Sequence, residues 1–67
     1  MDIRLNGAPH RLAGASLSEL LAQYDIDPNK PGVAVAINDA ILPRAEWPKA
    51  TLKAGDAVEI VRPHSGG

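Results

Sequence analysis

Apolar and polar residues alternate at the start of the sequence. Residues 2–6 follow the two-residue period of a half-buried strand. Asn6-Gly7 comes next, and this dipeptide is suited to the positive φ angles of a tight hairpin turn. We expect a return strand over residues 10–12, with Pro9 at a sheet edge or near the start of that strand. The pattern predicts an opening β-hairpin.

The hydrophobic period changes to that of a helix after residue 15. Ser16 and Glu19 have the spacing of a capping box, in which each side chain accepts a hydrogen bond from the other residue's backbone N–H. Apolar residues then recur at i, i+3, i+4 and i+7 in one stripe: Leu17, Leu20, Leu21 and Tyr24. Asp25, Asp27 and Pro28 disfavour continuation, so we expect a helix of about nine residues that ends near residue 24 or 25.

The rest of the chain predicts three more strands. Residues 33–38 are the clearest, and alternation divides five of them between two faces: Val33, Val35 and Ile37 on one, Ala34 and Ala36 on the other. A turn at residues 38–39 leads to a short strand at residues 40–42. After a turn at residues 53–56, the last strand covers residues 57–62.

A single helical turn is expected at residues 44–47, with Pro43 at its first position and Pro48 at its end. The order of elements predicts an α+β fold in which one helix packs on a mixed sheet of four to five strands. A right-handed crossover would place the first and last strands side by side and parallel in the middle, the ubiquitin-like β-grasp arrangement. The predicted core is Ile3, Leu5, Leu12, Leu17, Leu20, Leu21, Val33, Val35, Ile37, Leu42, Leu52, Val58 and Ile60. We expect the domain to span residues 1–63, followed by a flexible C-terminal tail at residues 64–67.

Composition narrows the function classes. Seven Lys and Arg oppose eight Asp and Glu without charged runs, which argues against binding to nucleic acid or to an anionic membrane surface. The chain has no cysteine and therefore no thiolate nucleophile, disulfide framework or usual zinc site. It also has no apolar stretch of transmembrane length, and its N-terminus lacks the layout of a signal peptide. We expect a cytoplasmic protein.

Residues for catalysis are sparse. The sequence shows no paired carboxylates at useful spacing and no Gly-rich phosphate loop, which argues against an enzyme. His10 and His64 have no partners at metal-ligand spacing, so we expect solvated surface residues and no metal site, although His64 could contact a partner near the tail.

The sequence ends on Gly66-Gly67. Glycine is the costliest residue to order and the most permissive in φ and ψ. A double glycine therefore suits a thin, flexible end that must enter the active site of another protein. A frayed terminus is the other reading, since chain ends are commonly disordered.

Three segments of the chain form a recognisable set. They are the strand Val33-Ala34-Val35-Ala36-Ile37-Asn38, the segment Ile41-Leu42-Pro43-Arg44 with Trp47 three residues on, and Gly55-Asp56 before Val58-Glu59-Ile60-Val61. Together they resemble the ThiS family of thiamin-pathway sulfur carriers. The similarity covers essentially the whole chain, and the Asn-x-x-Ile-Leu-Pro-Arg-x-x-Trp pattern is its most specific part. Pro63-His64 departs from the family by being stiffer and more polar.

The resemblance implies that the reagent of this protein is its own C-terminus. A ubiquitin-activating-like (ThiF-like) adenylyltransferase would use ATP and Mg²⁺ to form an acyl-adenylate on Gly67. Sulfur from a persulfide donor would then displace AMP and leave a Gly67 thiocarboxylate. That group would give its sulfur to a thiazole synthase (ThiG-like), while the chain itself binds no cofactor. Ser65 and Gly66 would form the tail that carries Gly67 into the enzyme.

A docking surface is expected on the open face of the sheet. Ala34, Ala36 and Val61 are small apolar residues that a partner could contact next to the tail, or they are simply tolerated surface. Arg62 could steer the tail toward phosphates, or it is a solvated strand end. Arg44 and Trp47 could contact the activating enzyme, but packing of Trp47 on the core beside a stacked Arg44 is the favoured interpretation.

Two other classes of function stay open. One is a related thiocarboxylate carrier, such as the small subunit of molybdopterin synthase or a carrier for amino-acid or RNA thiolation. The other is a ubiquitin-like modifier conjugated to lysines, or a plain interaction module. The short chain and the Ile-Leu-Pro-Arg-x-x-Trp segment favour the thiamin pathway.

Overall fold

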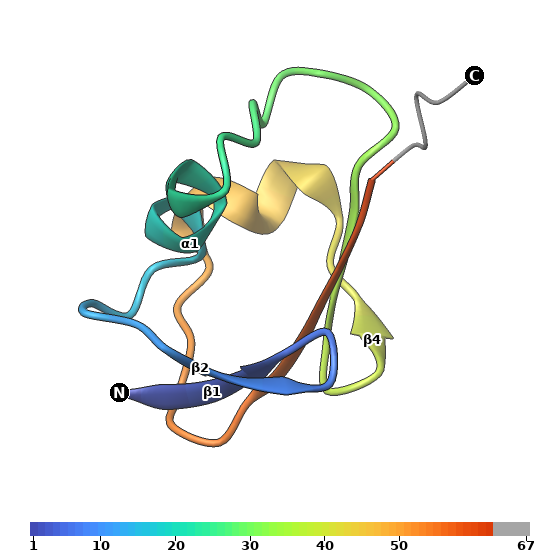
Figure 1. Ribbon diagram of the computed structural model, residues 1–67. Helices are drawn as coiled ribbons and strands as arrows, with labels where there is room; N and C mark the ends of the chain where they lie inside the picture. The colour runs from blue at the N-terminus through green and yellow to red at the C-terminus, as the bar shows by residue number, and fades with distance from the viewer. Residues whose placement is uncertain (63–67) are drawn as a thin grey trace.

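Within residues 1–62, five strands form one mixed sheet in the order β2-β1-β5-β3-β4, and two helices lie together on one side of it (Figure 1). The computed structural model describes residues 1–62. Its elements are β1 (Asp2–Leu5), β2 (Ala8–Arg11), α1 (Leu17–Gln23), β3 (Ala34–Ile37), β4 (Ala40–Ile41), the 3₁₀ helix η1 (Arg44–Lys49) and β5 (Ala57–Val61). The predicted tail at residues 64–67 lies outside the described residues, so the domain boundary stays a prediction.

The opening hairpin is confirmed. Asn6 and Gly7 have φ angles of 50° and 84°, and the turn pairs Leu5 with Ala8 across the antiparallel strands β1 and β2. Pro9 lies in β2, which is the edge strand, so its missing N–H removes no ladder bond from the sheet interior.

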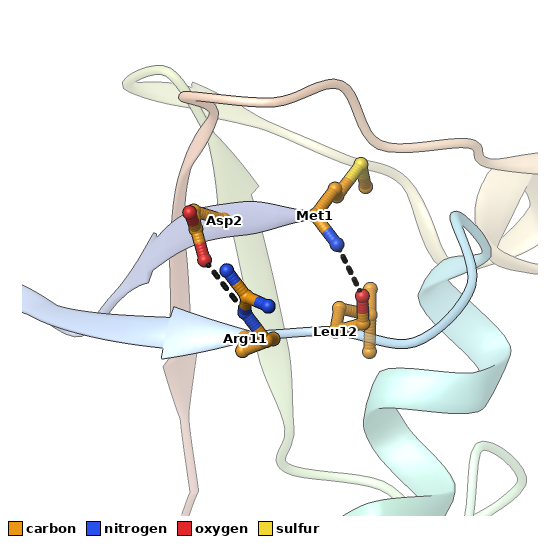
Figure 2. Close-up of polar contacts among 4 residues, drawn as sticks. All are labelled: Met1, Asp2, Arg11 and Leu12. Atoms are coloured by element: carbon orange, nitrogen blue, oxygen red, sulfur yellow. Dashed lines mark hydrogen bonds and ion pairs between the residues drawn. The ribbon is translucent and has the colours of Figure 1, made fainter.

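The open end of this hairpin is closed by the start of the chain (Figure 2). The amino group of Met1 donates a hydrogen bond of 2.7 Å to the carbonyl of Leu12, and the Leu12 N–H donates one of 2.9 Å to the carbonyl of Met1. Beside them, Arg11 Nε lies 3.1 Å from Asp2 Oδ1 in an exposed ion pair. Surface pairs of this kind contribute little to stability.

Strands β1 and β5 are parallel neighbours in the middle of the sheet, with Arg4 opposite Ala57. The intervening chain carries α1 across one face, and β3 returns antiparallel to β5. This connectivity confirms the α+β fold class and the β-grasp arrangement predicted from the order of elements.

Helix α1 begins at a side-chain cap and ends in a left-handed residue. Ser16 Oγ accepts a 3.0 Å hydrogen bond from the Glu19 N–H, which is half of the predicted capping box. At the other end Asp25 has a φ of 55°, its N–H bonds to the Ala22 carbonyl, and the Ile26 N–H bonds to the Leu21 carbonyl. These two bonds form a Schellman motif, with Asp25 in the place usually taken by glycine. The helix is therefore seven residues long, shorter than predicted.

The core differs from the predicted set in two ways. Ile26 is buried but was not predicted, while Val33, Ile37 and Leu42 are only half-buried at its margin; Trp47, which was expected to pack on the core, is fully buried within it. Ile26 is buried because the Schellman motif turns it back against Leu21, the hydrophobic contact that usually accompanies this motif.

The helical turn after β4 is longer than predicted. Pro43 precedes η1 as its N-cap rather than occupying its first position, and Pro48 lies inside η1 instead of ending it. Because proline has no N–H, Pro48 cannot donate the bond to the carbonyl three residues back, and η1 lacks that one bond. This correction places Trp47 in the middle of η1, where its side chain turns into the core.

A buried carboxylate joins two turns at the start of β5. Asp56 is 7% exposed, and its two oxygens accept hydrogen bonds from the Lys53 N–H at 2.8 Å and from Asn38 Nδ2 at 3.0 Å. The backbone bond from Lys53, the amide of Asn38 and the charge of Lys53 lower the pKa of Asp56 despite its burial.

We expect Asp56→Ala to lower the free energy of unfolding by roughly 1.5–3 kcal/mol, the usual contribution of hydrogen bonds to a charged group. Because the folded-state pKa is lowered, this stability is present at neutral pH and is lost as the pH falls below the ordinary value of 3.8 and through the folded pKa. Urea unfolding at pH 7 and at pH 3 measures both effects. The exposed Glu46→Gln in η1 is the control, and equal stability of Asp56→Ala and the parent at pH 7 would contradict the prediction.

Candidate functional site

The predicted C-terminal tail follows β5 in the sequence. The turn between β1 and β2 holds the end of β5 in place. Asn6 lies just beyond β1, where its Oδ1 accepts a 2.8 Å hydrogen bond from the Ile60 N–H and its Nδ2 donates one of 3.3 Å to the Ile60 carbonyl. The side chain thus continues the ladder between β1 and β5 after β1 has ended. Ser65, Gly66 and Gly67, the expected reactive tail, lie outside the described residues, as does His64.

The open face of the sheet carries Ala34, Ala36 and Val61, three of the four residues predicted for docking, while Arg62 lies on the other side. Ala34 pairs with Val61, and Ala36 pairs with Glu59, so these four side chains share the face opposite the core. Ala34 is exposed, Ala36 is half-buried and Val61 is 62% exposed. The structure therefore brings these three residues together on one face, at the end of β5.

Ile41 is a member of this face that sequence reasoning missed. It pairs with Ala36 across β3 and β4, and it is 73% exposed, more than Tyr24 or Val61. The signal was present in the sequence: a two-residue turn at Asn38-Asp39 places residue 41 opposite residue 36, and residues paired across antiparallel strands share a face. We call Ala34, Ala36, Ile41 and Val61 the apolar patch.

Charged residues occupy the neighbouring half of the same face. Arg4 on β1 lies opposite Ala57, and its guanidinium donates a 2.7 Å hydrogen bond to the carbonyl of Gly7. Asp2 and Arg11 form their ion pair further along the hairpin. The open face is thus divided into the apolar patch over β3, β4 and β5 and a charged half over β1 and β2.

Arg62 lies on the opposite side of the sheet from Val61. Its Nη1 donates a 3.4 Å hydrogen bond to the carbonyl of Tyr24, the C-cap of α1. It also lines a cleft of about 390 Å³ together with Ile26, Lys30 and other residues of the loop that follows α1. A cation is favourable at the C-terminal end of a helix. Arg62 is therefore held at the helix side of the sheet in the free protein, and its predicted contact with a partner stays a prediction.

Arg44 and Trp47 form a structural pair, which supports the packing interpretation. Trp47 is 2% exposed, and its indole N–H donates a 3.0 Å hydrogen bond to the Leu42 carbonyl. The Arg44 guanidinium lies 4.3 Å from the centre of the Trp47 ring and donates to the carbonyls of Pro28 and Val33. The pair thus fastens the loop before β3 to η1.

His10 is half-buried rather than fully solvated, contrary to the sequence-based expectation. Its Nε2 lies 3.1 Å from Gln23 Oε1, and its ring packs against Tyr24 with centroids 5.8 Å apart. The register of the first hairpin explains this position, because His10 pairs with the buried Ile3 and so faces the helix. These contacts tie edge strand β2 to the end of α1.

Residues 1–62 contain neither a metal-binding cluster nor a membrane-spanning helix. This part of the chain holds no group of three or more His, Cys, Asp or Glu residues that could bind a metal ion. No helix within it has the length and apolar character needed to cross a membrane.

Comparison with known proteins identifies the family. The family model described as the ThiS family matches residues 3–67. The chain belongs to the ThiS family. A sulfur carrier protein ThiS from Thermus thermophilus is 38% identical to this ThiS-family chain over 63 residues, which cover 94% of it and 95% of the relative. The sulfur carrier protein ThiS of Escherichia coli is 36% identical over 55 residues, which cover 82% and 80% of the two chains.

Solved structures agree with the fold of this ThiS-family chain. A crystal structure of the thiamine biosynthesis protein ThiS from Geobacter metallireducens superimposes with a TM-score of 0.77 at 33% identity and covers all of both chains. A solution NMR structure of a thiamine biosynthesis protein from the same organism gives a TM-score of 0.79 at 33% identity, covering the whole chain and 88% of the other. The comparisons therefore confirm the resemblance inferred from the sequence, both for the family and for the fold.

Proposed function

We propose that this sulfur carrier of thiamin biosynthesis holds its sulfur as a thiocarboxylate on Gly67. The observation that carries the proposal is the agreement between family membership and the ending Gly66-Gly67. The family match runs through residue 67 and therefore includes this ending. A chain without cysteine has no thiol of its own to carry sulfur, so an activated terminal carboxylate is the chemically sensible carrier group.

The reaction needs partners, because a carboxylate is a poor acceptor for sulfur. We propose that a ThiF-like adenylyltransferase uses ATP and Mg²⁺ to form the Gly67 acyl-adenylate, releasing pyrophosphate. A persulfide sulfur then attacks the acyl carbon and AMP leaves. Reductive cleavage of the resulting acyl disulfide by a thiol gives the thiocarboxylate, which a ThiG-like thiazole synthase consumes. In this scheme the chain is a group carrier and not an enzyme. Its cytoplasmic location remains a prediction.

Intact mass spectrometry tests this proposal directly. The chain is incubated with ATP, Mg²⁺, a persulfide donor, a thiol reductant and the ThiF-like enzyme. We expect its mass to rise by the difference between a sulfur and an oxygen atom, and we expect no rise when ATP is omitted. Conjugation to target lysines would instead give heavier bands on a denaturing gel, which would favour a ubiquitin-like modifier.

The apolar patch is our proposed docking surface for the adenylyltransferase. It ends at Val61, three residues before the start of the predicted tail at residue 64, so a partner seated on it lies close in sequence to the segment that must enter its active site. Ile41 and Val61 are the large apolar side chains exposed on this face, and such a cluster is typical of the buried centre of an interface.

We expect Ala36→Arg to weaken binding to the ThiF-like enzyme by at least about tenfold, because a bulky charge at an interface centre causes steric and desolvation costs. Ala36 lies between Glu59 and Ile41 in the pairing across the three strands, so the arginine would stand in the patch itself. Calorimetric titration gives the affinity, and circular dichroism checks the fold. Unchanged affinity with a native spectrum would exclude this face from the interface.

A further inference from the structure

Glu59 is an isolated charge among the apolar residues of the open face. Strands β3, β4 and β5 contain no other charged residue. Glu59 lies on β5, in the interior of the sheet, and it is paired with Ala36, while Ala36 is in turn paired with Ile41. Residues paired directly across strands have Cβ atoms about 4.5–5.5 Å apart. Glu59 therefore lies beside Ala36 at the edge of the apolar patch, where a partner seated on the patch would contact it.

No cation of residues 1–62 neutralises this carboxylate. The single ion pair among these residues joins Arg11 to Asp2. The nearest cation by strand pairing is Arg4 on the neighbouring strand β1, and its guanidinium bonds to the Gly7 carbonyl. Arg62 lies on the helix side of the sheet. Glu59 is exposed, so water solvates its charge in the free protein.

Docking changes the surroundings of Glu59. A partner that covers both Val61 and Ala36 must also cover Glu59, because Glu59 shares the face with Val61 and lies opposite Ala36. Removing an ionised carboxylate from water is costly unless a charge of opposite sign and hydrogen bonds replace the lost water. An apolar partner surface would suit the patch but would leave this charge unpaired.

We infer that the enzyme surface that docks on the apolar patch presents an arginine or lysine opposite Glu59. This inference rests on the proposed function, since it takes the ThiF-like adenylyltransferase as the partner. The contact gives the enzyme a means of selecting this carrier, because other apolar surfaces would leave the enzyme's cation buried without a partner. It also fixes the direction in which the carrier lies on the enzyme, and therefore the direction in which the tail leaves.

The test compares two charge variants with a matched control, using the full chain and the purified ThiF-like enzyme of the same organism. We expect Glu59→Gln to raise Kd about tenfold and Glu59→Arg to raise it about a hundredfold or more, as for close interfacial charge pairs. Glu46→Gln and Glu46→Arg make the same changes on η1, away from the open face, and are expected to leave Kd unchanged. Circular dichroism and thermal unfolding confirm that each variant is folded.

Two further measurements separate a specific pair from a general charge effect. The affinity of the parent chain should fall as salt is raised, and Glu59→Gln should reduce that dependence. Replacing exposed arginines and lysines of the enzyme singly by glutamate should reveal one change that restores binding of Glu59→Arg. A restoring change identifies the partner cation.

The outcomes distinguish this inference from the proposals it rests on. If Ala36→Arg weakens binding while both Glu59 variants bind as the parent does, the patch is the docking surface and the inference is wrong. Glu59 would then serve only to keep an apolar sheet face from self-association. Unchanged binding for all three variants would reject the docking surface as well. Failure of the parent chain to gain the sulfur mass would reject the proposed function, whatever the affinities show.

Discussion

Deleting Gly67 is expected to abolish thiocarboxylate formation while leaving the fold intact. Deletion moves the terminal carboxylate back by one residue, about 3.3–3.6 Å along an extended chain. Misplacement of a reacting group by about 1 Å can lower a rate a hundredfold. Adding one alanine after Gly67 moves the carboxylate forward by the same length and puts a Cβ beside the reacting carbon. We therefore expect both variants to lose at least about a hundredfold in rate.

Time-resolved intact mass measures this loss, with the ThiF-like enzyme, ATP and the persulfide donor in excess. The buried core found among the described residues runs from residue 3 to residue 60, so neither change alters a residue of it. The free energy of unfolding should therefore stay within roughly 0.5 kcal/mol of the parent value, as for most surface changes. Sulfur gain at the parental rate by either variant would show that Gly67 is not the reactive end.

The pairing of the strands could be predicted from the sequence because each turn carries its own chemical signal. Asn6-Gly7 and Asn38-Asp39 both adopt positive φ angles, which set two-residue hairpins and therefore the register of the strands that they join. Register in turn decides which face each side chain occupies. The open face, with Ala34, Ala36 and Val61, follows from these local signals and from alternation.

Features that depend on the backbone conformation of a single residue or on contacts between distant segments could not be predicted from turns and alternation. Asp25 gives no sequence signal for a left-handed residue as strong as glycine does, so the burial of Ile26 behind α1 was missed. The bond between Asn6 and Ile60 joins residues 54 positions apart and depends on the parallel pairing of β1 with β5. The isolation of Glu59 likewise becomes visible only once the positions of Arg4 and Arg62 are known.

The candidate site has two parts, the C-terminal end and the apolar patch, and the sequence predicts them to different extents. The reactive end is predicted from Gly66-Gly67 and from family resemblance, which are properties of the sequence, and it stays a prediction. Alternation predicts Ala34, Ala36 and Val61 of the proposed docking surface, and the strand pairing observed in the structure adds Ile41, which lies opposite Ala36. The patch ends at Val61, three residues before the start of the predicted tail at residue 64.

Trp47→Ala is expected to destabilise the domain most among core substitutions, by about 3–5 kcal/mol, as for other large aromatic residues removed from cores. Native domains are stable by only about 5–15 kcal/mol, and small ones lie at the low end. The change leaves a cavity beside Leu21 and Ile26, removes the hydrogen bond to the Leu42 carbonyl and takes away the ring on which Arg44 stacks. Urea unfolding followed by circular dichroism should show a variant that is largely unfolded or close to it.

Trp47→Phe separates the packing of this side chain from a direct role in binding. Phenylalanine keeps most of the buried apolar surface but cannot donate to the Leu42 carbonyl, so we expect a loss of about 1–3 kcal/mol, the cost of leaving a buried polar group unpaired. The folded variant should bind the ThiF-like enzyme with the parental affinity, because Trp47 is 2% exposed and lies away from the apolar patch. A folded Trp47→Phe with weakened binding would instead show that Trp47 contacts the enzyme. Parental affinity would leave Trp47 with a role in the fold alone, as the ring on which Arg44 stacks while it anchors the loop before β3.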